Sequence, residues 1–155
     1  MTDRALPEPA VAATDAIPGP TLADFEDARE RLRGIVQETP MERSRYLSGM
    51  LGADVLLKCE NLQRTGAYKI RGAYNMLSRL DGEQRARGVV AASAGNHAQG
   101  VAFSATELGI RSTIFMPLGV ALPKLQATRD YGAAVELRGM DFQSALAAAV
   151  EHVER

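Results

Sequence analysis

Two short segments of the sequence carry residues whose types and spacing could do chemistry. The first contains Lys69, which follows a glycine-containing turn and stands at the start of a predicted helix. A lysine amine that loses its proton is a nucleophile and can form a Schiff base with a carbonyl group. The second segment, residues 93–97, connects an apolar strand to a helix. Backbone N–H groups at the start of a helix bind anions, so this segment predicts a carboxylate site.

The surroundings of Lys69 distinguish it from the commonest kind of lysine, which is solvated at the surface. Its neighbours are apolar, and the glycines near it leave room for a flat ring to approach the backbone. An amine held away from water has a lowered pKa and reacts as a nucleophile. The sequence therefore predicts a desolvated Lys69, with a solvated lysine as the alternative. Arg71 is either an ion-pair partner or a solvated helix residue. The residues that define the setting are Gly66, Tyr68, Ile70, Gly72 and Ala73.

The segment at residues 93–97 also has two interpretations. The simpler one is a tight strand-to-helix connection made of small residues. The functional one is a site for a substrate carboxylate, because Ser93 and Asn96 add side-chain donors to the free backbone N–H groups. His97 either touches the ligand or only begins the helix. The complete segment reads Ser93, Ala94, Gly95, Asn96 and His97.

The elements that must position these residues follow from hydrophobic spacing and from glycine and proline stops. Residues 61–67 form a polar turn. From residue 89 onward, short strands alternate with helices, and this pattern requires crossover connections and a parallel sheet covered by helices. Predicted helices span residues 22–36, 70–80, 96–108, 123–131 and 141–153. Predicted strands span residues 54–59, 89–92, 112–116 and 133–137.

Composition excludes several classes of protein. The net charge of -1 gives no sign of a nucleic-acid partner or a membrane surface. No apolar run is long enough to span a membrane. Two histidines and the single Cys59 are too few for a structural zinc site, and a disulfide within the chain is impossible. Residues 1–20, rich in alanine and proline, are predicted to be a disordered arm without a signal peptide.

Residues 60–73 resemble the pyridoxal phosphate attachment signature of the serine/threonine dehydratases. That family shares the fold of the tryptophan synthase β subunit (fold type II), so the resemblance implies a three-layer α/β/α architecture with a parallel sheet. It covers about residues 21–155. Ala67 departs from the serine that commonly precedes Tyr-Lys in the signature. The matching residues are Glu60, Thr65, Ala67, Tyr68, Lys69, Ile70, Arg71, Gly72 and Ala73.

The resemblance also implies roles for individual residues. Lys69 would hold pyridoxal 5'-phosphate and abstract the substrate α-proton, and Asn96 would hydrogen-bond the 3′-oxygen of the cofactor. Residues 93–97 would hold the α-carboxylate of an amino-acid substrate. Racemases of the family carry a serine at the position of Ala94, so this alanine favours elimination over racemisation.

The function implied is threonine dehydratase (L-threonine ammonia-lyase), acting on L-threonine or L-serine in the cytoplasm, in isoleucine biosynthesis, as a homo-oligomer. The alternatives are an amino-acid racemase of the same fold and a catalytically incompetent α/β fragment. Residues 21–74 would begin the large cofactor-binding subdomain, and residues 75–155 would form the small one. The rest of the catalytic domain, including a glycine-rich phosphate loop, is expected to be absent from this chain. Residues 21–70 are therefore expected to be poorly ordered in isolation.

Overall fold

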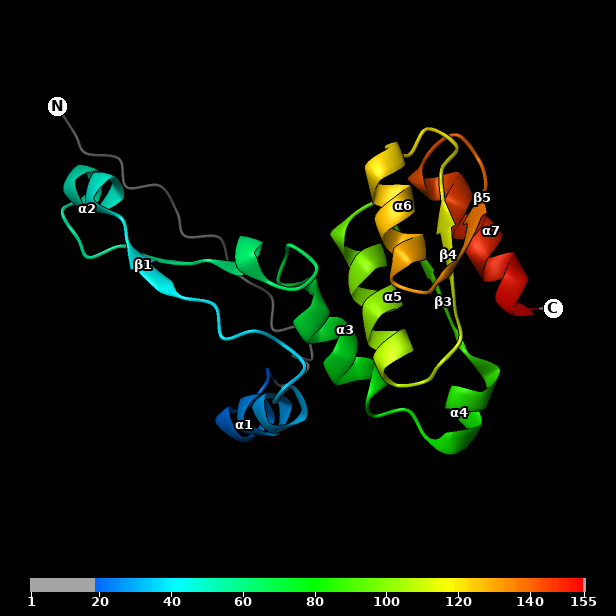
Figure 1. Ribbon diagram of the computed structural model, residues 1–155, viewed down its shortest axis with the longest axis horizontal. Helices are drawn as coiled ribbons and strands as arrows, with labels where there is room; N and C mark the ends of the chain where they lie inside the picture. The colour runs from blue at the N-terminus through cyan, green and yellow to red at the C-terminus, as the bar shows by residue number, and fades with distance from the viewer. Residues whose placement is uncertain (1–18, 155) are drawn as a thin grey trace, which may run out of the picture.

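The computed structural model describes residues 19–154, so the predicted disordered arm over residues 1–20 lies almost entirely outside the described part. The C-terminal half of the chain forms a compact α/β unit, and the N-terminal part extends away from it (Figure 1). The helices are α1 (Leu22–Arg31), α2 (Arg45–Leu51), α3 (Lys69–Leu77), α4 (Gly82–Arg87), α5 (Asn96–Glu107), α6 (Leu122–Asp130) and α7 (Phe142–Glu154), with a 3-10 turn, η1 (Glu60–Leu62). The strands are β1 (Met41–Arg43), β2 (Leu56–Lys58), β3 (Val89–Ala92), β4 (Ser112–Met116) and β5 (Ala134–Leu137).

A parallel three-stranded sheet forms the centre of the compact unit, in the order β3-β4-β5. Ala91 pairs with Ile114 and Ile114 pairs with Val135, which fixes the register across the sheet. Helices α5 and α6 lie on one face of this sheet and α7 lies on the other (Figure 1). The prediction of a parallel sheet covered by helices is therefore confirmed. The strands are parallel because each connecting helix returns the chain to the end of the sheet where the previous strand began.

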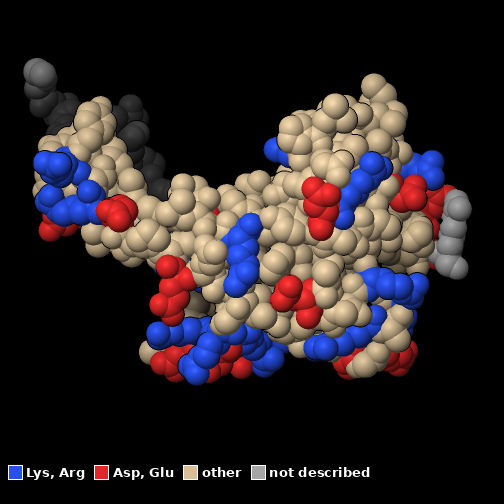
Figure 2. Space-filling view, viewed as in Figure 1, with Lys and Arg blue, Asp and Glu red and all other residues tan. Residues whose placement is uncertain are grey.

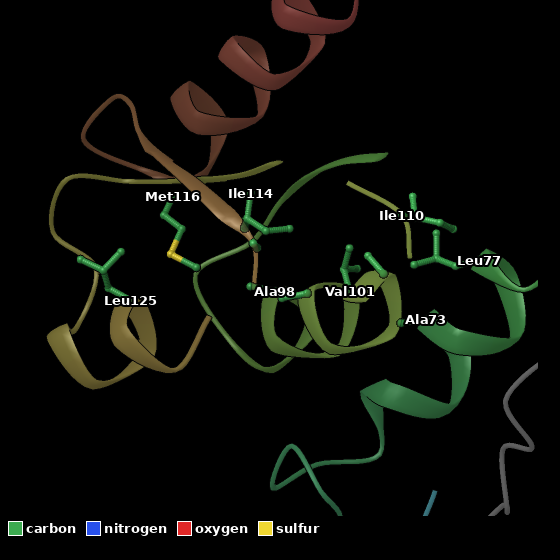
Figure 3. Close-up of a cluster of buried hydrophobic side chains, with 11 residues drawn as sticks. Ala73, Leu77, Ala98, Val101, Ile110, Ile114, Met116 and Leu125 are labelled. Atoms are coloured by element: carbon green, nitrogen blue, oxygen red, sulfur yellow. The ribbon is translucent and has the colours of Figure 1, made fainter. Parts of the chain in front are cut away.

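The core lies mainly between the sheet and α5, where alanines and one glycine allow close packing. Ile114 and Met116 are fully buried on the face of β4 toward α5, together with Ala98 and Ala102 from α5 itself. Ala73 and Leu77 of α3 extend this core on the far side of α5 (Figure 3). A smaller cluster joins Phe115 to α7 on the opposite face. Burial on both faces of β4 confirms the three-layer arrangement.

Strand β3 differs from the expected buried strand because it has a neighbour on only one side. Its four residues are each half-buried. A groove of about 960 Å³ runs along it, lined by residues of α3, β3 and α7. The apolar composition of Val89–Ala92 indicated a buried strand, but an edge strand leaves one row of its side chains and backbone groups open.

Short-range signals explain where the helices begin and end. Thr21 and Asp24 form a reciprocal capping box at the start of α1. The predicted helix over 22–36 ends earlier, at Arg31, because Gly34 adopts a φ of +76° in the turn that follows. Asp141 accepts hydrogen bonds from the backbone N–H and hydroxyl of Ser144 and thereby caps the start of α7.

Four short elements were not predicted. They are strand β1, which pairs antiparallel with the predicted β2, and the helical elements α2, η1 and α4, each of seven residues or fewer. The predicted helix over 70–80 ends at Leu77, and Asp81 caps α4 instead of only ending the preceding helix. Elements this short carry less than two turns of hydrophobic periodicity, so their pattern is weak.

The N-terminal part leaves many large apolar side chains in solvent. Leu22, Phe25 and Tyr46 are 74%, 60% and 78% exposed. Charged residues of both signs lie side by side over α1 and α4 (Figure 2) and pair within these helices, as Arg31 does with Asp27 and Arg87 with Glu83. Over residues 19–154, no helix is both long and apolar enough to cross a membrane.

Candidate functional site

Lys69 is the first residue of α3 and follows a tight turn. In that turn the backbone N–H of Gly66 donates to the carbonyl of Gln63 at 2.7 Å, and Gly66 adopts a φ of +67°, a conformation that favours glycine. Gln63 and Thr65 are 4% exposed, so the turn is anchored by its polar side chains. The polar turn expected over residues 61–67 is confirmed.

The Lys69 side chain is exposed, which corrects the expectation of an amine enclosed by apolar neighbours. Ile70 is fully buried and Ala73 is 7% exposed, and both belong to the interior. Successive helical residues point about 100° apart, so the residue after Lys69 faces the core while Lys69 faces out. The Tyr68 ring lies near the amine, with its centre 5.0 Å from Nζ.

The space around the amine is open at the two glycines expected to admit a flat ring. A Cβ atom built on Gly66 or on Gly72 would meet no other atom within 4 Å. The turn and the first turn of α3 therefore leave backbone accessible beside Lys69, and a planar ligand could approach it there.

The segment at residues 93–97 forms the connection from β3 to α5. The Ser93 hydroxyl oxygen accepts hydrogen bonds from the backbone N–H groups of Gly95 and Ala98, both at 3.3 Å. Ser93 thus satisfies part of the helix start, in addition to the donor role expected for it. The amides of Asn96 and His97 are in the first turn, where no carbonyl four residues earlier lies within the helix. These two amides are available to bind an anion.

Lys124 adds a positive charge to this helix start. It lies in the first turn of α6, and its Nζ is 3.8 Å from the position that a Cβ on Gly95 would occupy. An ammonium group beside free amides at a helix start favours a negatively charged ligand. Sequence reasoning missed Lys124, because it is distant in the chain from residues 93–97.

The structure brings Lys69 and the 93–97 segment together through the packing of α3 on α5. Gly100 of α5 lies directly against the backbone of Lys69. Burial, and secondly the positive charge of Lys69, lower the pKa of His97 below its ordinary value of 6.5, so the imidazole is neutral at pH 7. The positive charge of Lys69 thus acts on the imidazole of His97 across the contact between α3 and α5.

A partly buried ion pair fixes Arg71, whose role the sequence had left open. Arg71 Nε and Nη2 each donate to one carboxylate oxygen of Glu60 at 2.8 Å, and these side chains are 33% and 15% exposed. Thr39 also donates its hydroxyl to Glu60. The hydrogen bonds from Arg71 are the main reason why the pKa of Glu60 falls from 4.5 to about 2. The charged pair therefore holds the first turn of α3 against the segment at residues 37–40.

A second pair of hydrogen bonds reinforces this connection. The Gln63 side-chain amide accepts from the N–H of Gln37 at 2.8 Å and donates to its carbonyl at 3.0 Å. Lys58 Nζ donates to the carbonyl of Thr39 at 2.5 Å. Sequence reasoning missed this network, because its partners lie 19 and 26 residues apart and no local pattern joins them.

Over residues 19–154, no group of three or more histidine, cysteine, aspartate or glutamate side chains is placed to hold a metal ion. The groups that the site does offer are an exposed amine, a helix start with free amides, and a second ammonium group. This donor set suits an anionic ligand that carries a carbonyl group.

The chain is similar to known pyridoxal-phosphate dependent proteins. Residues 32–155 match the family described as pyridoxal-phosphate dependent enzyme. The chain is 54% identical over 130 residues to an L-threonine ammonia-lyase of Geobacter sulfurreducens, a match over 84% of this chain and 32% of that protein. The chain thus spans about a third of the length of this relative.

Solved structures agree on the fold. The processed form of threonine deaminase isoform 2 from Solanum lycopersicum matches with a TM-score of 0.77 at 39% identity, over 84% of this chain and 38% of that one. Maize serine racemase matches with a TM-score of 0.78 at 34% identity, over 84% of this chain and 40% of that one. The fold expected from residues 60–73 is thereby confirmed.

Proposed function

The chain belongs to the family of pyridoxal-phosphate dependent enzymes, and from that premise we propose that the protein carrying it is a threonine ammonia-lyase. This enzyme would convert L-threonine, or L-serine, to 2-oxobutanoate, or pyruvate, and ammonia. The observation that carries the proposal is the meeting of Lys69, at the start of α3, with the start of α5 at residues 93–97. The 54% identity to an L-threonine ammonia-lyase supports the same activity.

The residues present fit pyridoxal phosphate. Lys69 offers a primary amine at the protein surface, and Gly66 and Gly72 leave open space beside it for a flat ring. When bound, the cofactor supplies an electron sink that stabilises negative charge on the substrate α-carbon. Lys69 Nζ would bond to the cofactor aldehyde in the resting protein, and the same atom would take the proton from the substrate α-carbon.

The start of α5 would orient the substrate and the cofactor. The amides of Asn96 and His97 would receive the α-carboxylate, and the Ser93 hydroxyl hydrogen is available to donate as well. The Asn96 side-chain amide would hydrogen-bond the 3′-oxygen of the cofactor.

Ala94 favours elimination over racemisation, which is the second candidate function in view of the serine racemase neighbour. Racemisation requires a group that donates a proton to the α-carbon from the face opposite the lysine. The methyl group of Ala94 has no exchangeable proton. Elimination needs no proton from that face: Lys69 would remove the α-proton, and the β-hydroxyl would take up a proton and leave as water. Water would then hydrolyse the remaining enamine to the keto acid and ammonia.

The experiment is product analysis on the purified protein loaded with cofactor. With L-threonine, we expect 2-oxobutanoate and ammonia in equal amounts, and Lys69→Ala should abolish both. Recovery of D-allo-threonine, the product of inversion at the α-carbon alone, without any keto acid would reject the proposal in favour of the racemase. A preference for serine would leave the reaction class unchanged, because one methyl group changes binding by only about 1–3 kcal/mol.

Assembly into a homo-oligomer and a cytoplasmic location stay predictions. Sedimentation velocity of the loaded protein measures the first, and fractionation of the source cells measures the second.

A further inference from the structure

Gly100 makes an unusually close contact with the peptide that carries Lys69. A Cβ atom on Gly100 would stand 3.1 Å from the Lys69 carbonyl carbon, 3.2 Å from its oxygen and 3.2 Å from the Ile70 nitrogen. All three atoms are backbone, so no side-chain rotation could make room. Gly100 is buried in the middle of a twelve-residue helix, α5, where glycine is less favourable than alanine by about 1 kcal/mol. The close approach accounts for its presence.

A contact with the preceding part of the chain also holds the Lys69 peptide. Arg71, two residues after Lys69, donates two hydrogen bonds of 2.8 Å to Glu60, which precedes Lys69 in the chain. Ile70 is fully buried between these contacts. The backbone of Lys69 therefore has little freedom to move when α5 changes its distance from α3.

Asn96 shares a helix face with Gly100. It lies four residues earlier in α5, and residues four apart are neighbours on a helix surface. The contact at Gly100 therefore also sets how close Asn96 and the free amides at the start of α5 come to Lys69. A methyl group at position 100 would separate the two helices by a few tenths of an ångström at this point.

We propose that Gly100 is a positioning residue, whose missing side chain sets the distance from the Lys69 amine to Asn96 and the start of α5. The proposal rests on the proposed function for the roles of Lys69 and Asn96. Small displacements matter here, because a misplacement of about 1 Å of a reacting group can cost about a hundredfold in rate.

The test compares Gly100→Ala with wild type in the complete protein. Three properties are measured: the visible absorption band of the lysine-bound cofactor, the cofactor dissociation constant, and kcat and KM for L-threonine. We expect a shifted band and a kcat lower by about tenfold. The cofactor dissociation constant and KM should each change by less than about threefold, because the anion contacts themselves stay in place.

Two control variants separate positioning from packing. Val101, the residue after Gly100, packs into the core and not onto Lys69, and Val101→Ala removes part of its buried side chain. It should lower the melting temperature without shifting the band. Gly49→Ala, in α2, adds a methyl group that meets no atom within 4 Å and should leave all three properties unchanged.

A double-mutant cycle tests whether Gly100 acts through Asn96. In an Asn96→Ala background, Gly100→Ala should shift the band much less than it does in wild type. Equal shifts in both backgrounds would overturn the proposal. Failure of Gly100→Ala to fold, or an unshifted band with unchanged kcat, would make Gly100 a packing residue and also overturn it. Absence of the band in wild type would instead reject the proposed function.

Discussion

The ion pair between Glu60 and Arg71 makes a stability prediction that depends on pH. Glu60 is 15% exposed and its pKa falls from 4.5 to about 2, chiefly because Arg71 donates two hydrogen bonds to it. One pKa unit corresponds to about 1.4 kcal/mol, so the shift sets an upper value of about 3 kcal/mol. Since 33% of the Arg71 side chain is in solvent, screening reduces this, and we expect about 2 kcal/mol.

The perturbation is Glu60→Gln, which keeps the size of the side chain and removes its charge. A carboxyl group whose pKa is lower in the folded state stabilises the fold above its unfolded pKa. That stabilisation is lost as the pH falls toward the folded value. The variant should therefore be less stable than wild type by about 2 kcal/mol at pH 7. The difference should shrink below pH 4.5 and nearly vanish as the pH approaches 2.

The assay is urea unfolding followed by circular dichroism, at several pH values between 7 and 3, on both proteins without cofactor. Glu83→Gln is the matched control, because Glu83 forms an ion pair with Arg87 on an exposed helix surface with both side chains more than 60% exposed. We expect it to cost less than about 0.5 kcal/mol. An equal loss for Glu60→Gln at pH 7 and pH 3, or a loss no larger than that of the control, would refute the reasoning.

Three further predictions test other parts of the site and the fold. Lys69→Met should raise the pKa of His97, because part of its lowering comes from the lysine charge, and an NMR titration of the imidazole would detect this. An unchanged titration would mean that the two side chains are too far apart for the lysine charge to act on the imidazole. Ser93→Ala should cost about 1 kcal/mol of stability through the lost bond to Ala98 and raise KM for threonine, measured by unfolding and steady-state kinetics; an unchanged KM would remove Ser93 from the carboxylate site. Ile114→Ala should cost about 2–5 kcal/mol in urea unfolding, and a smaller loss would mean that the central strand is not packed as described.

The sequence predicted best where local signals repeat. Strands and helices after residue 88 alternate, and α5 and α6 are each followed by a glycine of positive φ, Gly109 and Gly132. The resemblance of residues 60–73 added the family and its fold. Lys69 and residues 93–97 could be selected together because both lie at helix starts, where free amides and side chains are exposed.

The remaining features depend on contacts between distant residues. Glu60 and Arg71 are separated by eleven positions, and whether they pair depends on how η1 and α3 fold back on each other. The sequence does not indicate the exposure of Lys69, because apolar neighbours along the chain need not surround a side chain in space, and Ile70 faces the core. Gly100 gave no signal either, since its closeness to Lys69 exists only once α3 crosses α5.

The central claim is that Lys69 is the residue that holds the aldehyde of pyridoxal phosphate. Reduction of the loaded protein with borohydride fixes the cofactor on its lysine, and peptide mass spectrometry then locates the modified residue. The lysines of this chain are Lys58, Lys69 and Lys124. We expect the pyridoxyl group on the peptide that contains Lys69. A pyridoxyl group on another lysine, or none at all, would contradict the claim.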